Sequence, residues 1–417
     1  MPTWKWHCIG RLVALFMLAI GSIAGMTVGS RAHAETTFTP AVNLSQRYDS
    51  NVFYTPKRFL PPGKQEWDFI STLSTGLKVL NKSRLGDTEV QTWVNGNVYA
   101  YNTNLSYAST NVLATSDVSD WMNELLPGAK LRISDAFQYT PEPPAFLTGG
   151  KPEQSDIFAR GVQGYRANTY SNNLSADTGY SISRSVGLNA NYTYSIRRVG
   201  STFVTGTPFT FFDTTVHNVA TGPTYTFDGG DTLFVKYNYM ASDTSPTTAG
   251  VGREFTFTAH SIQPEYVTTI VRGWKATISG GATLVEEAQN KTFVSGKFAL
   301  LNDWDRRTRV SISVSRQAVP AYFGTGGALI SNVAQVYLSH DLSRLIILTV
   351  SGNYGHNETT TGNKFRIETI NGSAALDYKL TQDTKVSLSE VYSHFSFTGS
   401  PNFDRYATML TLTTEWK

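Results

Sequence analysis

The chain has 417 residues, of which 16% are charged, 12% are aromatic and one is a cysteine. A single cysteine excludes a disulfide-stapled scaffold and a zinc site built from several thiolates. Soluble domains carry about 25% charged residues, so this chain has few groups with which to solvate its surface. The composition predicts that part of the surface does not face water.

Residues 1–34 have the organisation of an export signal. Two basic residues precede an apolar run at 12–29, and Ala32-His33-Ala34 is the small-x-small pattern that a signal peptidase cleaves. We expect the mature chain to begin at Glu35. Removing the leader removes three bases and no acids, which leaves 32 of each and argues against a general affinity for nucleic acid. An uncleaved anchor helix is the alternative for this segment.

The rest of the chain has the alternation of β-strands. Apolar residues occupy every second position in 186–196, 308–314 and 346–354, with Asn, Thr, Ser and Arg between them. These segments are about ten residues long, the length that a tilted strand needs to cross the hydrocarbon layer. After residue 34 no apolar run reaches the length of a spanning helix, so only a closed barrel would cross a membrane. Helical spacing is confined to a short stretch around Val118–Leu126.

Connections between the segments alternate between short and long. Tight turns are expected at 183–185, 227–231, 272–273, 302–305, 342–344 and 381–383, and longer links at 52–65, 141–168, 200–212, 242–253 and 319–330. Short turns at one end and long loops at the other are typical of bacterial outer-membrane barrels. Aromatic residues near many strand ends, such as Tyr192, Tyr237 and Phe395, predict two interfacial girdles. A soluble β-sandwich is the alternative fold, because its strands alternate as well.

We therefore predict an all-β, antiparallel transmembrane barrel that occupies residues 35–417 as one domain. The segments number about eighteen, and sixteen is possible because the boundaries between Thr103 and Lys130 are indistinct. Trp416 ends the last strand one place before Lys417 and is our candidate for the C-terminal signal that the barrel assembly machinery reads. Outer-membrane lipids are the other expected partner.

A barrel of sixteen to eighteen strands is wide enough for an aqueous channel. Charged residues predicted to line it are Arg132, Asp177, Arg197, Lys236, Lys297, Arg307, Arg309, Arg366 and Glu368. Ion pairs that only brace the wall are the alternative role for each of them. The loop Pro141–Asn168 either folds inward and narrows the pore or lies outside as a contact surface, and the sequence does not choose between these.

Catalytic patterns are weak, and we predict no enzyme, no metal site and no cofactor. The histidines show no metal-ligand spacing, and no nucleophile elbow or phosphate-binding glycine loop is present. One pair has the residue types needed for hydrolysis. His394 and Ser396 share a face near the loop end of a strand, where a general base could lie beside a hydroxyl. A polar pair at the membrane interface is the alternative.

The stretch Tyr48-Asp49-Ser50-Asn51-Val52-Phe53 resembles the motif that ends the first strand of porin-2-like outer-membrane barrels, a family associated with exopolysaccharide and exosortase systems. The resemblance implies a porin-type barrel in the bacterial outer membrane, with envelope polysaccharide export components as partners. Asp49 and Asn51 would otherwise cap a turn.

These observations predict a passive channel for small polar solutes or a carbohydrate. The alternatives are a non-conducting barrel that acts as a scaffold for surface-polymer export, and a barrel lipid hydrolase that uses His394 and Ser396.

Overall fold

The computed structural model describes residues 35–416 apart from 144–159, 204–208, 248–252, 272, 306 and 361–363. The predicted signal peptide at 1–34 lies outside the described residues. Within the described ranges no helix has both the length and the apolarity needed to cross a bilayer.

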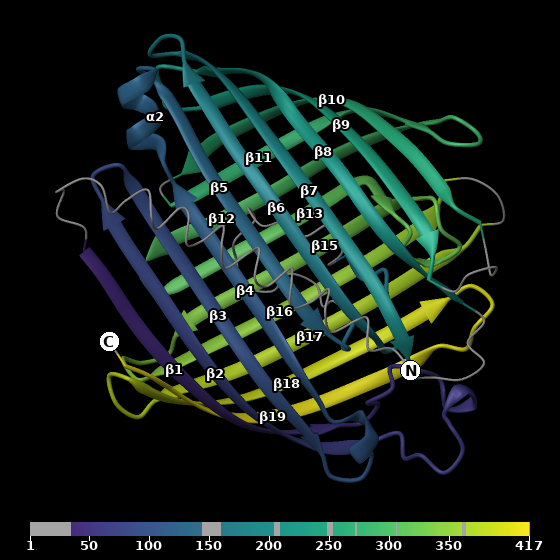
Figure 1. The fold of residues 1–417 in the computed structure, drawn as a ribbon. Coiled ribbons are helices and arrows are strands. Elements are labelled where there is room, and N and C mark those ends of the chain that lie inside the picture. The colour runs from purple at the N-terminus through teal and green to yellow at the C-terminus, as the bar shows by residue number, and fades with distance from the viewer. Residues whose placement is uncertain are drawn as a thin grey trace.

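Nearly all of the regular structure is β-strand (Figure 1). The strands are β1 (Glu35–Asp49), β2 (Asp68–Ser83), β3 (Gly86–Tyr99), β4 (Tyr107–Asp117), β5 (Ala129–Thr140), β6 (Ala167–Ser181), β7 (Val186–Thr202), β8 (Thr210–Thr226), β9 (Thr232–Pro246), β10 (Phe255–Val271), β11 (Trp274–Glu286), β12 (Lys291–Asp305), β13 (Thr308–Pro320), β14 (Phe323–Gly324), β15 (Ala328–Asp341), β16 (Ile346–Thr359), β17 (Arg366–Lys379), β18 (Thr384–Phe397) and β19 (Phe403–Glu415). The helices are α2 (Ser119–Leu125) and two 3-10 turns, Lys57–Phe59 and Thr103–Leu105.

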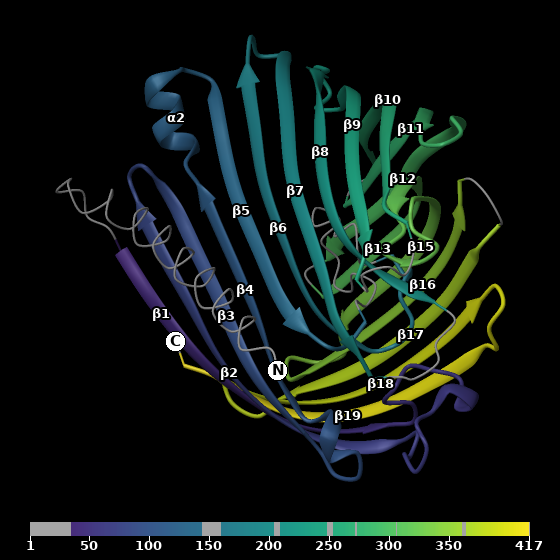
Figure 2. The same ribbon diagram turned by 45° about the vertical axis from the view of Figure 1, so that its right-hand side comes forward.

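The strands close into one antiparallel barrel (Figure 2). Each strand pairs with its neighbours in sequence, β13 pairs with β15, and β19 returns to β1 in a ladder from Ala41↔Glu415 to Asp49↔Ala407. The two-residue β14 is not part of this wall, and the closed sheet therefore has eighteen strands. The prediction of an eighteen-stranded barrel is confirmed.

The two ends of the barrel differ as the connection lengths predict. The described chain ends and the tight turns lie at one end, which we call the turn end, and the longer links lie at the other, the loop end. The turn between β4 and β5 holds α2, which accounts for the helical spacing seen in the sequence near Val118–Leu126.

The outer face is an apolar belt. Alternate residues along each strand are exposed Leu, Ile, Val, Tyr and Phe side chains; Val294 is 73% exposed, and Val98 and Ile262 are each 61% exposed. Such a surface is stable in contact with lipid and costly in water, which is how a membrane-spanning barrel differs from a sandwich. Among the outward tyrosines, Tyr406 lies near the loop end of its strand, whereas Tyr192 and Tyr237 lie nearer the turn end of theirs.

Phe395, which the sequence assigned to a girdle, and two further aromatics near strand ends face inward instead. Phe257, Phe395 and Phe397 are at most 7% exposed and belong to interior clusters. Their positions near strand ends fit a girdle, but their parity along the strands puts them on the inner face, where they meet segments that fold into the lumen.

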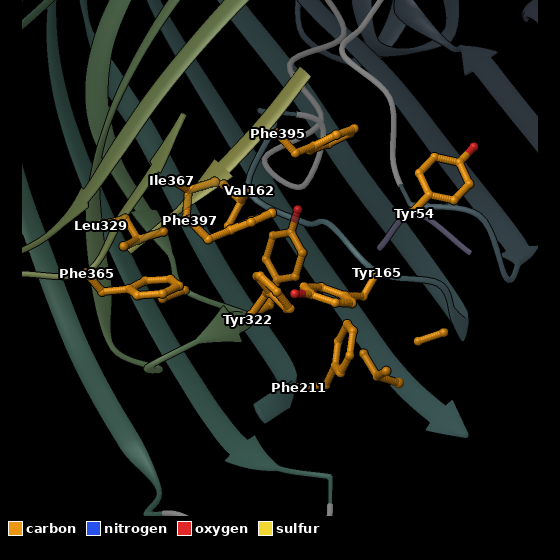
Figure 3. Packing of buried hydrophobic residues seen from close by; sticks show 14 of the residues in the cluster. Tyr54, Val162, Tyr165, Phe211, Tyr322, Leu329, Phe365, Ile367, Phe395 and Phe397 are labelled. Atoms are coloured by element: carbon orange, nitrogen blue, oxygen red, sulfur yellow. The ribbon is translucent and has the colours of Figure 1, made fainter. Parts of the chain in front are cut away.

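Three segments fill the loop end of the lumen, and we call them together the plug: residues 51–56, 160–166 and 321–327. Their apolar side chains join wall residues of β7, β8 and β17–β19 in one buried cluster, with Tyr165 and Tyr322 near its middle (Figure 3). The backbones are joined as well, because Tyr165 N donates to Tyr54 O at 3.0 Å. Tyr54 and Tyr165, the described non-glycine residues with positive φ, are both in the plug. The chain therefore adopts strained backbone there, at the cost that such a conformation carries.

The third plug segment is the tip of a hairpin that leaves the wall. The β12–β13 ladder ends at Gly296↔Arg316, whereas β13 and β15 stay paired up to Pro320↔Ala328. Where β13 is no longer paired with β12, the hairpin packs on the inner sides of β10–β12 through Ala318 and Ile330. Its tip, β14, pairs with β8 at Phe323↔Phe211 and Gly324↔Thr210. The hairpin thus crosses the lumen as a strap from β13 and β15 to β8.

Candidate functional site

The inner wall toward the turn end is polar. Six of the residues predicted to line the lumen share the inward parity of their strands. Arg197 is one of them and meets the plug, and the other five lie on this part of the wall: Arg132, Asp177, Lys236, Lys297 and Arg309. Arg132 lies opposite Asp177 in the β5–β6 ladder. Lys236 pairs with Glu265 at 2.6 Å, and Asp177 accepts a hydrogen bond from Asn191 at 2.6 Å. Ion pairing and access to the lumen therefore coexist on this wall.

The prediction that Arg366 and Glu368 line the lumen is wrong, because both side chains lie on the outer face. They share the face of Ile370, which is 46% exposed in the apolar belt, whereas Ile367 and Thr369 point inward and are buried. Glu368 instead meets His356 Nδ1 at 3.0 Å across the β16–β17 ladder. The error arose because a strand with polar residues on both faces carries no signal of which face is inner.

Arg307 also differs from its predicted position. It lies in the turn before β13, where its carbonyl accepts a hydrogen bond from Asp341 N at 2.8 Å. It therefore lies at the rim of the barrel, not on the wall of the lumen.

The motif at the end of β1 anchors the plug. Asp49, Asn51, Val52 and Phe53 are at most 1% exposed. Asn51 N donates to Asp49 Oδ1 at 3.1 Å, and the Asn51 side chain closes the turn by bonding Thr55 N and Thr55 O at 3.2 and 2.9 Å. Tyr48 stays on the outer face, beside Phe69, and Ser50 Oγ accepts from Tyr406 N at 2.8 Å. Asp49 and Asn51 therefore cap a turn, and the chain after this turn enters the lumen.

One ion pair ties this motif to β19, and a second joins β1 to the loop after β5. Arg405 of β19 grips Asp49 with Nε at 3.0 Å and Nη2 at 2.6 Å, and its guanidinium lies 4.6 Å from the centre of the Tyr54 ring. Arg47 of β1 binds Glu142 at 2.5 Å. Burial alone would raise the pKa of the Glu142 carboxyl, but the Arg47 guanidinium overcomes this and lowers that pKa to about 2.

Arg166 stands in an aromatic cage. Its guanidinium lies 4.9 Å from the ring centres of both Tyr99 and Tyr107 and 5.1 Å from that of Phe203, and Nη1 donates to the Tyr99 hydroxyl at 2.5 Å. Carbonyls of Val52 and Leu105 accept its remaining bonds at 3.3 Å each. Cation–π contacts hold a charge here, and none of the described residues places a carboxylate in direct contact with it.

Arg160 and Arg197 are two further arginines at the loop end of the lumen. Arg197 bonds Gln163 and lies 4.7 Å from the Tyr322 ring centre. Arg160, 9% exposed, donates to the hydroxyls of Ser331 and Ser315 at 2.9 Å each. In the described part of the chain it has no carboxylate within ion-pair distance. Burial accordingly lowers the pKa of Arg160 to about 10.

The described parts of the Pro141–Asn168 loop fold inward. Glu142 reaches Arg47 and the Tyr107 hydroxyl, and residues 160–166 are buried against β16 and β17. Residues 144–159 of this loop lie outside the described residues. Of the two arrangements that the sequence left open, the described residues therefore adopt the inward one.

The strap was missed in the sequence, where 319–330 was only a long link. A signal was present: a glycine triplet with one interruption, Gly324, Gly326 and Gly327, beside Tyr322 and Phe323. All three glycines have positive φ, which suits a chain that must turn back sharply. An aromatic pair at the tip of a loop is costly in water and gains from burial in the lumen.

The His394–Ser396 pair is on the outer face near the loop end. His394 Nδ1 is bound to Asp404 Oδ1 at 2.8 Å, and Asp404 also accepts from the Tyr392 hydroxyl at 2.9 Å. Ser396 lies opposite Glu368 in the β17–β18 ladder. Among the described residues no group of three His, Cys, Asp or Glu side chains is arranged as metal ligands.

Trp416 follows β19 at the turn end. It is 50% exposed, and its N–H donates to Pro40 O of β1 at 3.0 Å. The residue is thus accessible beside the seam where the first and last strands meet.

Comparisons with known proteins show similarity only at the level of the fold. No protein-family model and no curated protein matches the sequence. Similar solved structures include OccAB3 of Acinetobacter baumannii (TM-score 0.43, 10% identity, 92% of this chain and 99% of that chain) and the outer membrane protein OpdK of Pseudomonas aeruginosa (TM-score 0.46, 9% identity, 91% and 99%). OpdQ of Pseudomonas aeruginosa is similar too (TM-score 0.45, 9% identity, 91% and 97%).

Proposed function

We propose that the protein is a passive outer-membrane channel for small polar solutes, with its narrowest part at the plug. The observation that carries this is the closed eighteen-stranded wall with a polar inner face below a constriction at one end only. Barrels of this strand number are wide enough for a water-filled lumen. Inward segments that narrow such a lumen would set the size limit and the charge preference of what passes.

The charge of the constriction supports a mild preference for anions. Five arginines lie in or near the plug. Arg160 and Arg166 belong to it, Arg197 and Arg405 contact it, and Arg47 binds Glu142 of the loop that contains residues 160–166. Asp49 and Glu142 pair with two of them. Arg132, Asp177, Lys236, Lys297 and Arg309 line the wider part in this proposal, where opposite charges alternate and selectivity is weak.

The test is single-channel recording in a planar bilayer. The barrel purified in detergent should give discrete current steps, with a reversal potential slightly on the anion side in a KCl gradient. A folded barrel that never conducts would overturn the channel.

A non-conducting scaffold is the second candidate, and the apolar cluster that bridges the lumen favours it. The exopolysaccharide association rests on the Tyr48–Phe53 motif alone, and envelope polysaccharide export components would be its partners. A silent, heat-modifiable barrel that co-purifies with such components supports this candidate over the channel.

A lipid hydrolase is the third candidate, favoured by the bond that orients His394 toward Asp404. A Ser nucleophile would need a contact with that histidine, and its test is ester hydrolysis by the folded barrel that disappears in S396A. Hydrolysis that persists in S396A would remove this candidate.

A further inference from the structure

The outer face carries the same tyrosine–histidine arrangement twice. On β7 and β8, the Tyr192 hydroxyl and His217 Nδ1 are 2.9 Å apart, and the Tyr194 ring centre lies 5.0 Å from that of His217. On β9 and β10 the Tyr237 hydroxyl and His260 Nδ1 are 2.8 Å apart, and the ring centres of Tyr239 and His260 are 5.1 Å apart. In each case the tyrosine hydroxyl that contacts Nδ1 comes from the side of the histidine nearer the turn end.

Both arrangements stand at the loop-end border of the apolar belt. Tyr225 lies eight positions further along β8, where it packs against Phe227 with ring centres 4.8 Å apart, and Phe227 in turn contacts Tyr266. Eight residues of a strand tilted by about 40° rise roughly 20 Å, close to the height of the lipid-facing band of such barrels. His217 is therefore expected at the depth of the lipid headgroups on the loop side.

The two arrangements differ in the charge above the histidine. Beside His217 stands Arg198, whose Nη2 donates to Thr215 Oγ1 at 3.0 Å and whose Nη1 donates to Thr214 O at 3.1 Å. Thr215 is on the same outward face as His217 and two residues nearer the loop end, so Arg198 lies on the side of the imidazole away from Tyr192. Nε2 is the ring nitrogen of His217 that Tyr192 does not contact.

The acidic groups near Arg198 do not neutralise it fully. Asp213 Oδ2 is 3.9 Å from Arg198 Nε, while Asp213 Oδ1 accepts the Val199 N–H at 2.8 Å. Arg198 stays 31% exposed. Beside His260, by contrast, the Glu286 carboxylate stands 3.9 Å from Nε2.

We propose that Arg198, His217 and Thr215 form a binding site for the phosphate group of a membrane lipid on the outer face of β7 and β8. A guanidinium binds phosphate with two parallel hydrogen bonds, and an imidazole N–H adds a third donor. The acyl chains would then lie on the belt on the turn side of His217, beside Tyr192 and Val219. His260 has the same geometry with an acid in place of the guanidinium and does not bind phosphate. This site does not depend on whether the lumen conducts.

The test is native mass spectrometry of the full barrel in a non-ionic detergent with phosphatidic acid, and with diacylglycerol of the same chains as the ligand that lacks phosphate. We expect adducts with phosphatidic acid and none with diacylglycerol. R198Q and H217Q should each weaken binding roughly tenfold, because each removes a charge-assisted or aligned donor. H260Q, the matched control, should bind as the unaltered protein does.

Heat-modifiable electrophoretic mobility confirms that each variant is folded, and R198K, which keeps the charge but not the fork, should recover part of the binding. The proposal fails if R198Q or H217Q binds phosphatidic acid as tightly as the unaltered barrel. Equal loss in H260Q, equal binding of diacylglycerol, or displacement of the lipid by an equal concentration of inorganic phosphate would each also overturn it.

Discussion

Glu142 lies in the same loop as plug residues 160–166 and should make the plug sensitive to acid. Its pKa is lowered from the ordinary 4.5 to about 2 by Arg47, so the folded plug favours the ionised form. A depressed folded-state pKa contributes stability that is complete above the ordinary pKa and is lost as pH falls through the folded one. We expect the plug to loosen between about pH 4.5 and pH 2, seen as larger or noisier single-channel currents.

E142Q separates this effect from general acid damage. The amide keeps the shape of the side chain but does not titrate, so its currents at neutral pH should resemble those of the unaltered barrel near pH 2. If E142Q and the unaltered barrel respond identically to acid, another group is responsible.

Arg160 should set part of the anion preference. Its guanidinium is buried against neutral serine hydroxyls, so its charge remains to act on passing ions. R160Q should move the reversal potential toward zero selectivity. Stability should change little or rise, because removing a buried charge without a carboxylate partner removes a desolvation cost.

R366Q is the matched control for this prediction. Arg366 lies on the outer face, so the same loss of charge there should leave the reversal potential unchanged. Equal effects of R160Q and R366Q would show that overall charge, rather than the constriction, controls selectivity.

At the scale of elements, the strap from β13 and β15 to β8 is the feature that most distinguishes this barrel. Gly324 has φ +97°, and a Cβ there would come within 2.3 Å of the Phe365 ring. G324A should therefore displace β14 from β8 and enlarge the conductance. Gly399 has a similar φ of +79° with open space around it, so G399A isolates the backbone penalty of about 1 kcal/mol. Equal conductances of the two variants would mean that the strap does not restrict the lumen.

The strands were predictable because a period of two with apolar residues outward is a strong local signal, as in 186–196. The inward segments were not, because what drives them is contact with distant strands. Phe395 and Phe397 show the difference: their position near a strand end fits a girdle, and only the ladder from β18 to its neighbours shows that they face the lumen.

The predicted positions of Arg366 and Glu368 were wrong for a related reason. Their strand carries polar residues on both faces near the loop end, so the alternation there gives no direction. Of the residues that form the constriction, Arg197 was predicted to line the lumen, whereas Arg405 was not singled out, since a lone arginine in a strand has no motif. Asp49 was found only through the resemblance of its surrounding stretch.

At the scale of the whole molecule, closure explains the stability we expect. No strand of the described wall is left as a free edge along its whole length, because β19 returns to β1. The barrel should keep its compact electrophoretic mobility in SDS without boiling and lose it on heating. A mobility that never depends on heating would contradict the closed sheet.

The central claim is that the lumen conducts and that the plug limits it. The most direct measurement is the single-channel conductance of the unaltered barrel beside that of G324A, recorded in the same bilayer and salt. The account predicts discrete steps for the unaltered barrel and larger steps for G324A. Silence from both proteins, each shown to be folded by heat-modifiable mobility, would contradict it.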